Sequence, residues 1–259
     1  MKKKQDGYQV VPFPKMRHAI IDYLHEARRK HMIHALAEVD VTKARQIIRE
    51  HKARTGVSLS FTAFIITCLG RAVDENKVMH AYRKGRNQLV LFDDVDVNTL
   101  VEHEAEGHKI ATPYVIRAAN KKTFREIHQE IRAAQKEKAE EPQAIQRYPL
   151  LPLPIRRLFW WAFGKYPHLK KRIGGTVTVT AIGMFGKGAG WGIPITDYTL
   201  GITLSGIAEK PGVVDGRIEI REYLSMTISV DHDIIDGAPL ARFTQRLKEL
   251  IESGYSLSD

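Results

Sequence analysis

The chain has 259 residues, 43% hydrophobic and 27% charged, so it can build a packed core, and an intrinsically disordered protein is excluded. Its single cysteine excludes a disulfide within the chain, which suits a cytoplasmic location. No stretch reaches the roughly 20 uninterrupted apolar residues of a membrane span. The net charge of +10 comes without a recognised nucleic-acid motif, so nucleic acid is not an expected partner.

The first half of the chain reads mostly as helices. Apolar residues recur at helical spacing over 16–29, a second helix is expected from a cap at Thr42 to just before Gly56, and a third from Ser60 to about residue 75. The period then changes, and 88–92 and 95–101 predict two strands joined by two aspartates. A capping box at 123–126 predicts a polar helix that runs to about residue 140.

The second half reads mostly as strands. Residues 141–172 contain five prolines and are expected to be irregular. Beyond them, 176–180 alternates Thr and Val, 200–207 is apolar, and 213–220 carries the Asp-Gly pair of a tight hairpin. A last strand over 218–230 precedes a helix over 238–253. Early helices and late strands predict an α+β fold with a mostly antiparallel or mixed sheet, in one domain over 1–259.

The sequence S-V-D-H-D-I-I-D-G-A-P, at 229–239, carries the candidate chemistry. It places His232 and Asp236 four residues apart at the start of the last helix, followed by Gly237. A histidine can carry a proton near neutral pH, and an aspartate can hold the structure around it. Gly237 permits a turn or a close approach. A metal site would need a third ligand, and there is no H-E-x-x-H or cysteine pair, so no metal is expected.

This motif resembles the catalytic end of the dihydrolipoamide acyltransferases, the E2 components of 2-oxo acid dehydrogenase complexes, which share a fold with chloramphenicol acetyltransferase. Other segments resemble the same family in the same order, from about residue 14 to 254: L-S-F-T-A-F-I-I-T-C-L-G-R-A-V, V-D-V-N-T-L-V, G-H-K-I-A-T-P-Y-V-I-R-A-A-N-K-K-T-F-R-E-I, G-G-T-V-T-V-T-A-I-G-M-F-G and W-G-I-P-I-T-D-Y-T-L-G-I-T-L-S-G-I. The resemblance implies a chloramphenicol acetyltransferase-like α+β fold, a mixed sheet covered by helices, in a chain that forms trimers or larger assemblies of trimers.

The resemblance also implies a reaction, the transfer of an acyl group between coenzyme A and a thiol or hydroxyl acceptor. His232 matches the family's general base. Thr180 stands where the family has a serine that donates to the oxyanion. Asp236 matches a structural aspartate paired with an early arginine, here Arg17, and Gly237 supports the same loop. In relatives the histidine and the hydroxyl come from neighbouring subunits.

The chain departs from the family at four places. Asp233 replaces an arginine, Ala181 replaces an asparagine, and 141–172 is longer than usual. The resemblance begins near residue 14, so no lipoyl domain, and therefore no bound lipoyl group, is expected on this chain.

These departures leave three functions open. The chain could be a free-standing acyltransferase that uses acyl-CoA, an E2 core subunit acting on a lipoyl domain supplied by another chain, or a non-catalytic trimeric scaffold. The segment 141–172 has three readings as well. It could pack as a lid, touch a membrane peripherally through 150–172 with its aromatic and basic residues, or dock a protein partner.

Overall fold

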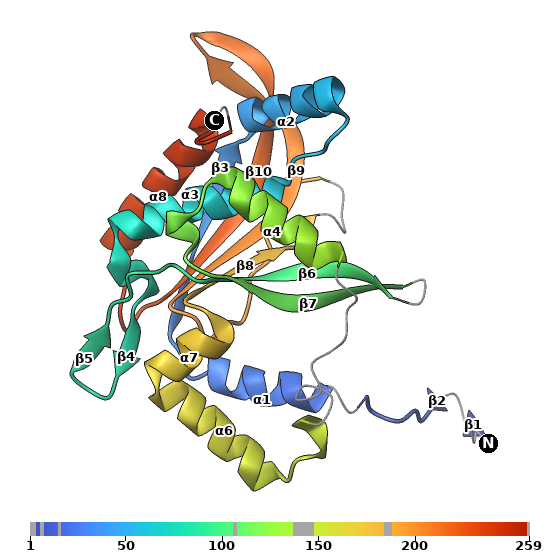
Figure 1. Cartoon of the computed structure of the whole chain (residues 1–259), viewed down its shortest axis with the longest axis vertical. Coiled ribbons are helices and arrows are strands. Elements are labelled where there is room, and N and C mark those ends of the chain that lie inside the picture. Colours follow the sequence, from blue (N-terminus) through green and yellow to red (C-terminus); the bar gives the residue numbers. More distant parts are fainter. Residues whose placement is uncertain are drawn as a thin grey trace.

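The computed structural model describes residues 4–5, 8–14, 17–105, 108–136, 148–183 and 188–257. Its centre is a six-stranded sheet in which β8 runs parallel to both of its neighbours while the other pairs are antiparallel (Figure 1). The predicted mixed sheet is therefore confirmed. In spatial order the strands are β3 (Met32–Asp40), β10 (Arg217–Asp231), β9 (Leu200–Val214), β8 (Val177–Ala181), β6 (Val97–Ala105) and β7 (His108–Ile116).

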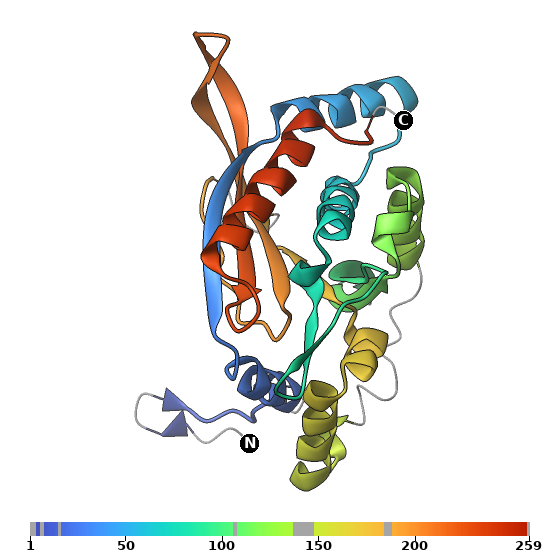
Figure 2. The same cartoon turned by 90° about the vertical axis from the view of Figure 1, so that its left-hand side faces the viewer.

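Helices cover one face of this sheet (Figure 2), and the alternation along the strands decides what they cover. In β8, Val177 and Val179 are fully buried in the main core, while Thr178 and Thr180 point to the opposite face. β9 and β10 alternate in the same way, so one sheet face is aliphatic and the other is rich in hydroxyls. The covering helices are α2 (Thr42–Thr55), α3 (Phe61–Glu75), α4 (Phe124–Lys136) and α8 (Gly237–Ser253).

The hydroxyl-rich face lies beneath the segment 188–199, which connects back into β9. Two backbone N–H groups of this segment donate to serines of the sheet, Gly192 to Ser205 at 3.0 Å and Gly190 to Ser225 at 3.3 Å. The indole N–H of Trp191 donates to the carbonyl of Ala37 at 3.2 Å. These bonds satisfy buried hydroxyls that an aliphatic cover would leave unpaired.

Most predicted helix ends are confirmed. The hydroxyl of Ser60 accepts from the N–H of Ala63 at 3.2 Å and caps α3. In the capping box of α4, the N–H of Thr123 donates to the carboxylate of Glu126 at 2.7 Å, and the N–H of Glu126 donates back at 3.3 Å. The cap predicted at Thr42 is wrong, because Thr42 is the first residue of α2 and its N–H donates to Asp40.

The two strands predicted on either side of Asp93 and Asp94 lie in different sheets. β5 (Gln88–Val90) pairs only with β4 (Tyr82–Lys84), in a separate two-stranded sheet. β6 starts at Val97, because the N–H of Val95 donates to the side chain of Asn120 rather than to a neighbouring strand.

The expectation of irregular structure over 141–172 is wrong from residue 148 onward, and 137–147 lie outside the described residues. A 3₁₀ turn, Tyr148–Leu150, leads into α6 (Leu153–Lys165) and α7 (Pro167–Gly174). Pro154 and Pro167 occupy the first turn of their helices, where a missing N–H is tolerated, so these prolines start the helices rather than break them.

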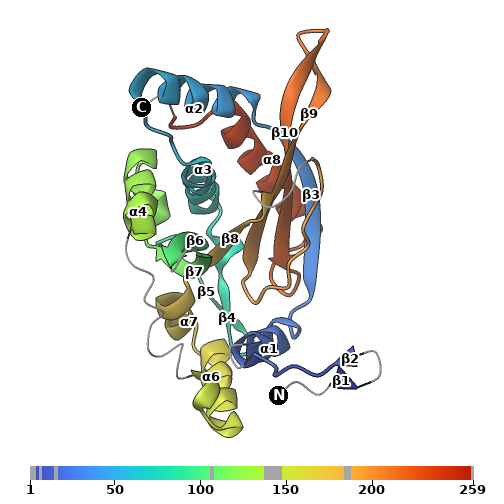
Figure 3. The ribbon, with the colours of Figure 1, turned by 90° about the vertical axis from the view of Figure 1, so that its right-hand side faces the viewer.

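The molecule has two distinct ends. β9 and β10 extend as a long hairpin at one end, turning at Asp215 and Gly216, both with positive φ, as the Asp-Gly signal predicted. At the other end α6 packs beside α1 (Arg17–Ala27) (Figure 3). The remaining short elements are β1 (Lys4–Gln5), β2 (Tyr8–Gln9) and the 3₁₀ turns Lys77–His80 and Ala119–Lys121.

Candidate active site

His232 stands on a tightly held turn directly after β10. The buried carboxylate of Asp231 pairs with Lys30 and accepts the N–H of Asp233 at 3.2 Å. The carbonyl of Asp231 accepts the N–H groups of the two isoleucines that follow, both at 3.0 Å, and the N–H of His232 donates to the carbonyl of His31 at 2.8 Å. The backbone is therefore fixed on both sides, while the imidazole itself is 46% exposed.

Asp236 lies next to this imidazole. It is the residue before α8, and its Oδ1 is 3.6 Å from Nδ1 of His232, an ion-pair distance that is too long for a direct hydrogen bond. Because Nδ1 faces the carboxylate, Nε2 is the nitrogen left to exchange a proton. A side chain at Gly237 would meet open space, and the φ of Gly237 is not positive, so the single chain gives no steric reason for this glycine and its supporting role stays a prediction.

Asp233, the residue that replaces the family's arginine, is paired on the outside of the turn. Its Oδ1 lies 2.9 Å from Nδ1 of His31, and its Oδ2 accepts from Arg83 of β4 at 3.2 Å. The hydrogen bond with His31 is the main cause that lowers the pKa of Asp233. These contacts connect the His232 turn to β4 and to the segment between α1 and β3, and local sequence patterns do not reveal them.

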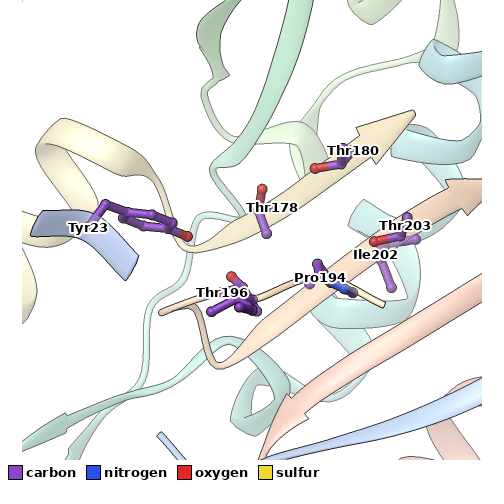
Figure 4. A pocket seen from close by; sticks show the side chains of 9 residues that line it. Tyr23, Thr178, Thr180, Pro194, Thr196, Ile202 and Thr203 are labelled. Atoms are coloured by element: carbon purple, nitrogen blue, oxygen red, sulfur yellow. The ribbon is translucent and has the colours of Figure 1, made fainter. Parts of the chain in front are cut away.

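Thr180 lines a small cavity on the hydroxyl-rich face of the sheet. Thr178 and Thr180 project from β8, Thr203 projects from β9, and Tyr23 reaches the cavity from α1 (Figure 4). The cavity holds about 60 Å³, and a water molecule needs roughly 10–15 Å³ measured in this way. It therefore has room for a few waters or a small polar group.

A buried ion pair lies close to Tyr23, one of the residues that line this cavity. The ammonium of Lys170 lies 2.7 Å from the carboxylate of Asp197 and donates to the carbonyl of the same residue at 2.5 Å. It also lies 4.6 Å from the centre of the Tyr82 ring. Burial lowers the pKa of Lys170 and, together with the nearby charge of Asp197, raises the pKa of Tyr23. Sequence analysis missed this pair, because its members are far apart in the chain and resemble ordinary surface charges.

The structure does not bring Thr180 and His232 together within one chain. Thr180 pairs across the ladder with Thr203, which pairs with Thr227, so the three threonines lie at one level of the sheet. His232 follows Thr227 by five residues, beyond the end of β10. With about 3.3 Å per residue along a strand and about 4.8 Å between strands, the two Cα atoms are on the order of 19 Å apart.

Arg17 begins α1, at the end of this helix remote from the turn of His232. Among the described residues, no ion pair links Arg17 to Asp236, whose one ion pair there is the contact with His232. The pairing that the resemblance implies is therefore not formed within the single chain and stays a prediction.

Within 17–105, 108–136 and the other described ranges, no group of three or more His, Cys, Asp or Glu side chains is arranged to hold a metal ion. None of the helices in the same part of the chain is both long and apolar enough to cross a membrane.

Comparison with known families shows the class of catalytic domain to which this fold belongs. Residues 5–146 and 168–257 match the family described as 2-oxoacid dehydrogenases acyltransferase (catalytic domain). The chain belongs to this family, which confirms the resemblance found in the sequence. Residues 147–167, which include all of α6, lie outside the match.

Known proteins support the same assignment. The lipoamide acyltransferase component of the branched-chain alpha-keto acid dehydrogenase complex of Bacillus subtilis is 26% identical over 95% of this chain and 53% of its own length. The chain spans about half the length of the curated relatives it matches.

Solved structures confirm the fold. The Azotobacter vinelandii dihydrolipoamide acetyltransferase has a TM-score of 0.69 and 20% identity, over 97% of this chain and 94% of the other. The cubic core of the pyruvate dehydrogenase multienzyme complex has a TM-score of 0.69 and 19% identity, with the same coverage. A chloramphenicol acetyltransferase has a TM-score of 0.54 and 17% identity, over 97% and 100%.

Proposed function

We propose that this chain is an acyltransferase that moves an acyl group between coenzyme A and a thiol or hydroxyl acceptor. Membership of the acyltransferase catalytic-domain family is the observation that carries the proposal, because the matched residues include both Thr180 and His232. Coenzyme A and its acyl thioester enter as substrates, and the proposal requires no metal and no lipoyl group bound to this chain.

Residue spacing supports the assignment of roles. The A. vinelandii structure comes from an investigation of the role of a serine, a histidine and an asparagine in the catalytic mechanism, with the histidine 52 positions after the serine and the asparagine four positions later. In this chain His232 follows Thr180 by 52 positions, and Asp236 follows His232 by four. Thr180 retains a hydroxyl, and Asp236 retains a side-chain oxygen that can face the imidazole.

In the proposed mechanism His232 is the general base. Its Nε2 takes the proton from the attacking thiol, because the thiolate is the better nucleophile. The bond from this sulfur to the acyl carbon forms, and the bond to the leaving sulfur then breaks. The departing thiolate recovers the proton from His232. Asp236 keeps Nδ1 oriented away from the reacting atoms, with Gly237 and Arg17 as the predicted supports of that arrangement.

Thr180 stabilises the intermediate between these two bond changes. Its hydroxyl donates to the oxyanion of the tetrahedral carbon, a bond that strengthens as the charge develops. Since Thr180 and His232 lie too far apart in one chain, the proposal pairs His232 of one subunit with the hydroxyl of a neighbour. A trimer, or a larger assembly of trimers such as the cubic core named for one structural relative, supplies that neighbour.

The acceptor has two candidate forms. The B. subtilis relative is a lipoamide acyltransferase component of a complex, which favours dihydrolipoamide carried on a lipoyl domain of another chain. A free small thiol or alcohol is the alternative. A trimeric scaffold without activity is less well supported, because His232 and the hydroxyl of Thr180 are both retained. The proposal places a single acyltransferase domain over 1–259 in the cytoplasm.

Purified protein incubated with acetyl-CoA and longer acyl-CoAs tests the proposal. Each reaction contains free dihydrolipoamide, a dihydrolipoylated lipoyl domain, or a small thiol or alcohol. Free coenzyme A and the acylated acceptor are measured by mass spectrometry. We expect acyl transfer that disappears in His232→Ala. Transfer to the lipoyl domain alone would identify an E2 core subunit, and no transfer to any thiol or hydroxyl acceptor would support the scaffold.

A further inference from the structure

The helix α6 has one face held by the protein and one face directed to solvent. On the inner face, the indole N–H of Trp160 donates to the hydroxyl of Tyr148 at 2.7 Å. The centres of the Trp160 ring and the Tyr23 ring of α1 lie 5.8 Å apart. The guanidinium of Arg156 lies 3.3 Å from the carboxylate of Asp22, and the side chain of Phe163 is buried. These contacts fix the orientation of α6, so the same side chains of the helix always face away from the chain.

The outer face is apolar and remains uncovered. Leu158 is 61% exposed and Trp161 is 50% exposed, and they lie three residues apart on the side of the helix opposite to Trp160 and Phe163. Exposed apolar side chains continue on both sides of them. We define the α6 outer face as Leu150, Leu151, Ile155, Leu158, Trp161 and Tyr166.

The charged side chains of α6 are all basic. Arg157 and Lys165 are exposed, and the ammonium of Lys165 lies 4.4 Å from the centre of the Trp161 ring. Residues 142–196 contain no aspartate or glutamate. Within this run, 148–172 also contain no Ser, Thr, Asn or Gln. The segment therefore offers apolar, aromatic and cationic groups and almost no neutral hydrogen-bonding side chains.

We propose that the α6 outer face binds an anionic lipid bilayer, with α6 lying parallel to the membrane surface. Leucines and Trp161 enter the boundary between headgroups and acyl chains, and Arg157 and Lys165 meet the lipid phosphates. Thirteen residues give a helix of about 20 Å, long enough to lie in that plane. The helix is a segment that the family model leaves unmatched, so the acyltransferase fold does not require it.

A protein partner would need a different surface. Protein interfaces carry about one hydrogen bond per 100–200 Å² and a polar rim. Residues 148–172 contain no Ser, Thr, Asn or Gln that could form such hydrogen bonds. If two copies met symmetrically through this face, each would bring the same basic residues against the other, in a chain of net charge +10. A bilayer accepts apolar, aromatic and cationic groups without directed hydrogen bonds, so it is the occupant that matches the composition.

The position of α6 links this surface to the candidate active site. Tyr23 packs against Trp160 on one side and lines the cavity of Thr180 on the other. A membrane bound at the α6 outer face would therefore lie at the end of the molecule that carries α1, remote from the β9–β10 hairpin (Figures 1 and 3).

Co-sedimentation with vesicles tests the proposal on the full chain. Vesicles of phosphatidylcholine alone are compared with vesicles that also contain phosphatidylglycerol, at low and high salt. The test variant is Leu158→Glu/Trp161→Glu. The matched control is Val213→Glu/Ile218→Glu, which makes the same charge change at residues 76% and 79% exposed on the distant hairpin. His232→Ala is included because vesicle binding should not depend on catalysis, so failure here and failure of the proposed function are distinguishable.

We expect binding to the anionic vesicles that weakens with salt, falls at least about tenfold in the test variant, and is unchanged in the hairpin control and in His232→Ala. In a Trp160→Phe/Trp191→Phe protein, emission from the remaining Trp161 should shift to shorter wavelength on anionic vesicles. No binding by the wild-type chain at low salt would overturn the proposal, as would equal losses in the two Glu variants. Dissociation of the oligomer in the test variant would instead identify a second copy as the occupant. If the wild-type chain binds no vesicles and the test variant loses acyl transfer to a lipoyl domain, the lipoyl domain would be identified as the occupant of this face.

Discussion

Lys170→Met removes one partner of the buried ion pair beside the candidate site and keeps most of the surrounding packing. Lys170 and Asp197 are only 6% and 5% exposed, and the lysine ammonium lies 4.6, 5.6 and 5.4 Å from the centres of the rings of Tyr82, Phe163 and Tyr198. Methionine is of similar length and apolar, so it can occupy the same space. The substitution therefore isolates the loss of the charge.

The size of the stability loss follows from the charge of Asp197 that remains buried. In Lys170→Met the carboxylate of Asp197 stays buried, and its Oδ1 already lacks a hydrogen-bond partner. Removing one partner of a buried pair costs about 3–5 kcal/mol, because the other charge is left uncompensated. Replacing both charges by groups of similar volume is often close to neutral. Lys170→Met/Asp197→Asn should therefore recover most of the stability that the single variant loses.

Urea unfolding at constant pH measures this directly, with the free energy of unfolding compared among wild type, the two single variants and the double variant. We expect a large positive coupling between the two sites. A loss below about 1 kcal/mol in Lys170→Met would refute the reasoning, as would a double variant that simply adds the two single losses.

Three further predictions concern the chemistry and the core. In steady-state transfer assays, Thr180→Ala should lower kcat by about 100- to 1000-fold with little change in KM. Thr180→Ser should lower kcat only slightly, and equal losses in the two variants would contradict a hydroxyl donor. His232→Ala should abolish transfer while its urea midpoint stays at the wild-type value, and retained turnover would exclude it as the base. Burial lowers the pKa of His80 to about 4, so the unfolded chain takes up the proton first, and stability should fall by about 3 kcal/mol as the pH drops from about 6.5 to 4. The contribution of His80 to this loss should be absent in His80→Gln, and a pH profile in that variant identical to the wild-type profile would contradict the assignment.

The parts of the fold that were predictable have local causes. Ser60, the Thr123–Glu126 box and the Asp-Gly turn each act within a few residues, and the structure shows all three. The alternation of Val and Thr over 176–180 fixed which side of β8 faces the core. The helices of 148–174 were missed because five prolines over 141–172 suggested irregular chain, although Pro154 and Pro167 lie in first turns.

The candidate site was predictable only in part, because its contacts are long-range. The motif placed His232 beside Asp236, and the structure agrees. Several of its contacts join segments that are distant in the chain. They are the contacts of Asp233 with His31 and Arg83, the buried ion pair of Lys170 with Asp197, and the position of Tyr23 in the cavity. No local pattern specifies such contacts. The separation of Thr180 from His232 likewise required the strand register.

The central claim is that one active site combines His232 of one subunit with Thr180 of another. Its most direct test is the activity of mixed assemblies made by co-expressing His232→Ala and Thr180→Ala chains with different affinity tags and purifying through both tags. Each variant alone should be nearly inactive. If subunits mix at random at equal amounts, about a quarter of the sites in a cyclic assembly combine an intact histidine with an intact threonine. Mixed assemblies should therefore recover roughly a quarter of wild-type activity before the enrichment by two tags is considered. Activity in the mixed assemblies no higher than in the separate variants would show that the two groups do not share a site across subunits.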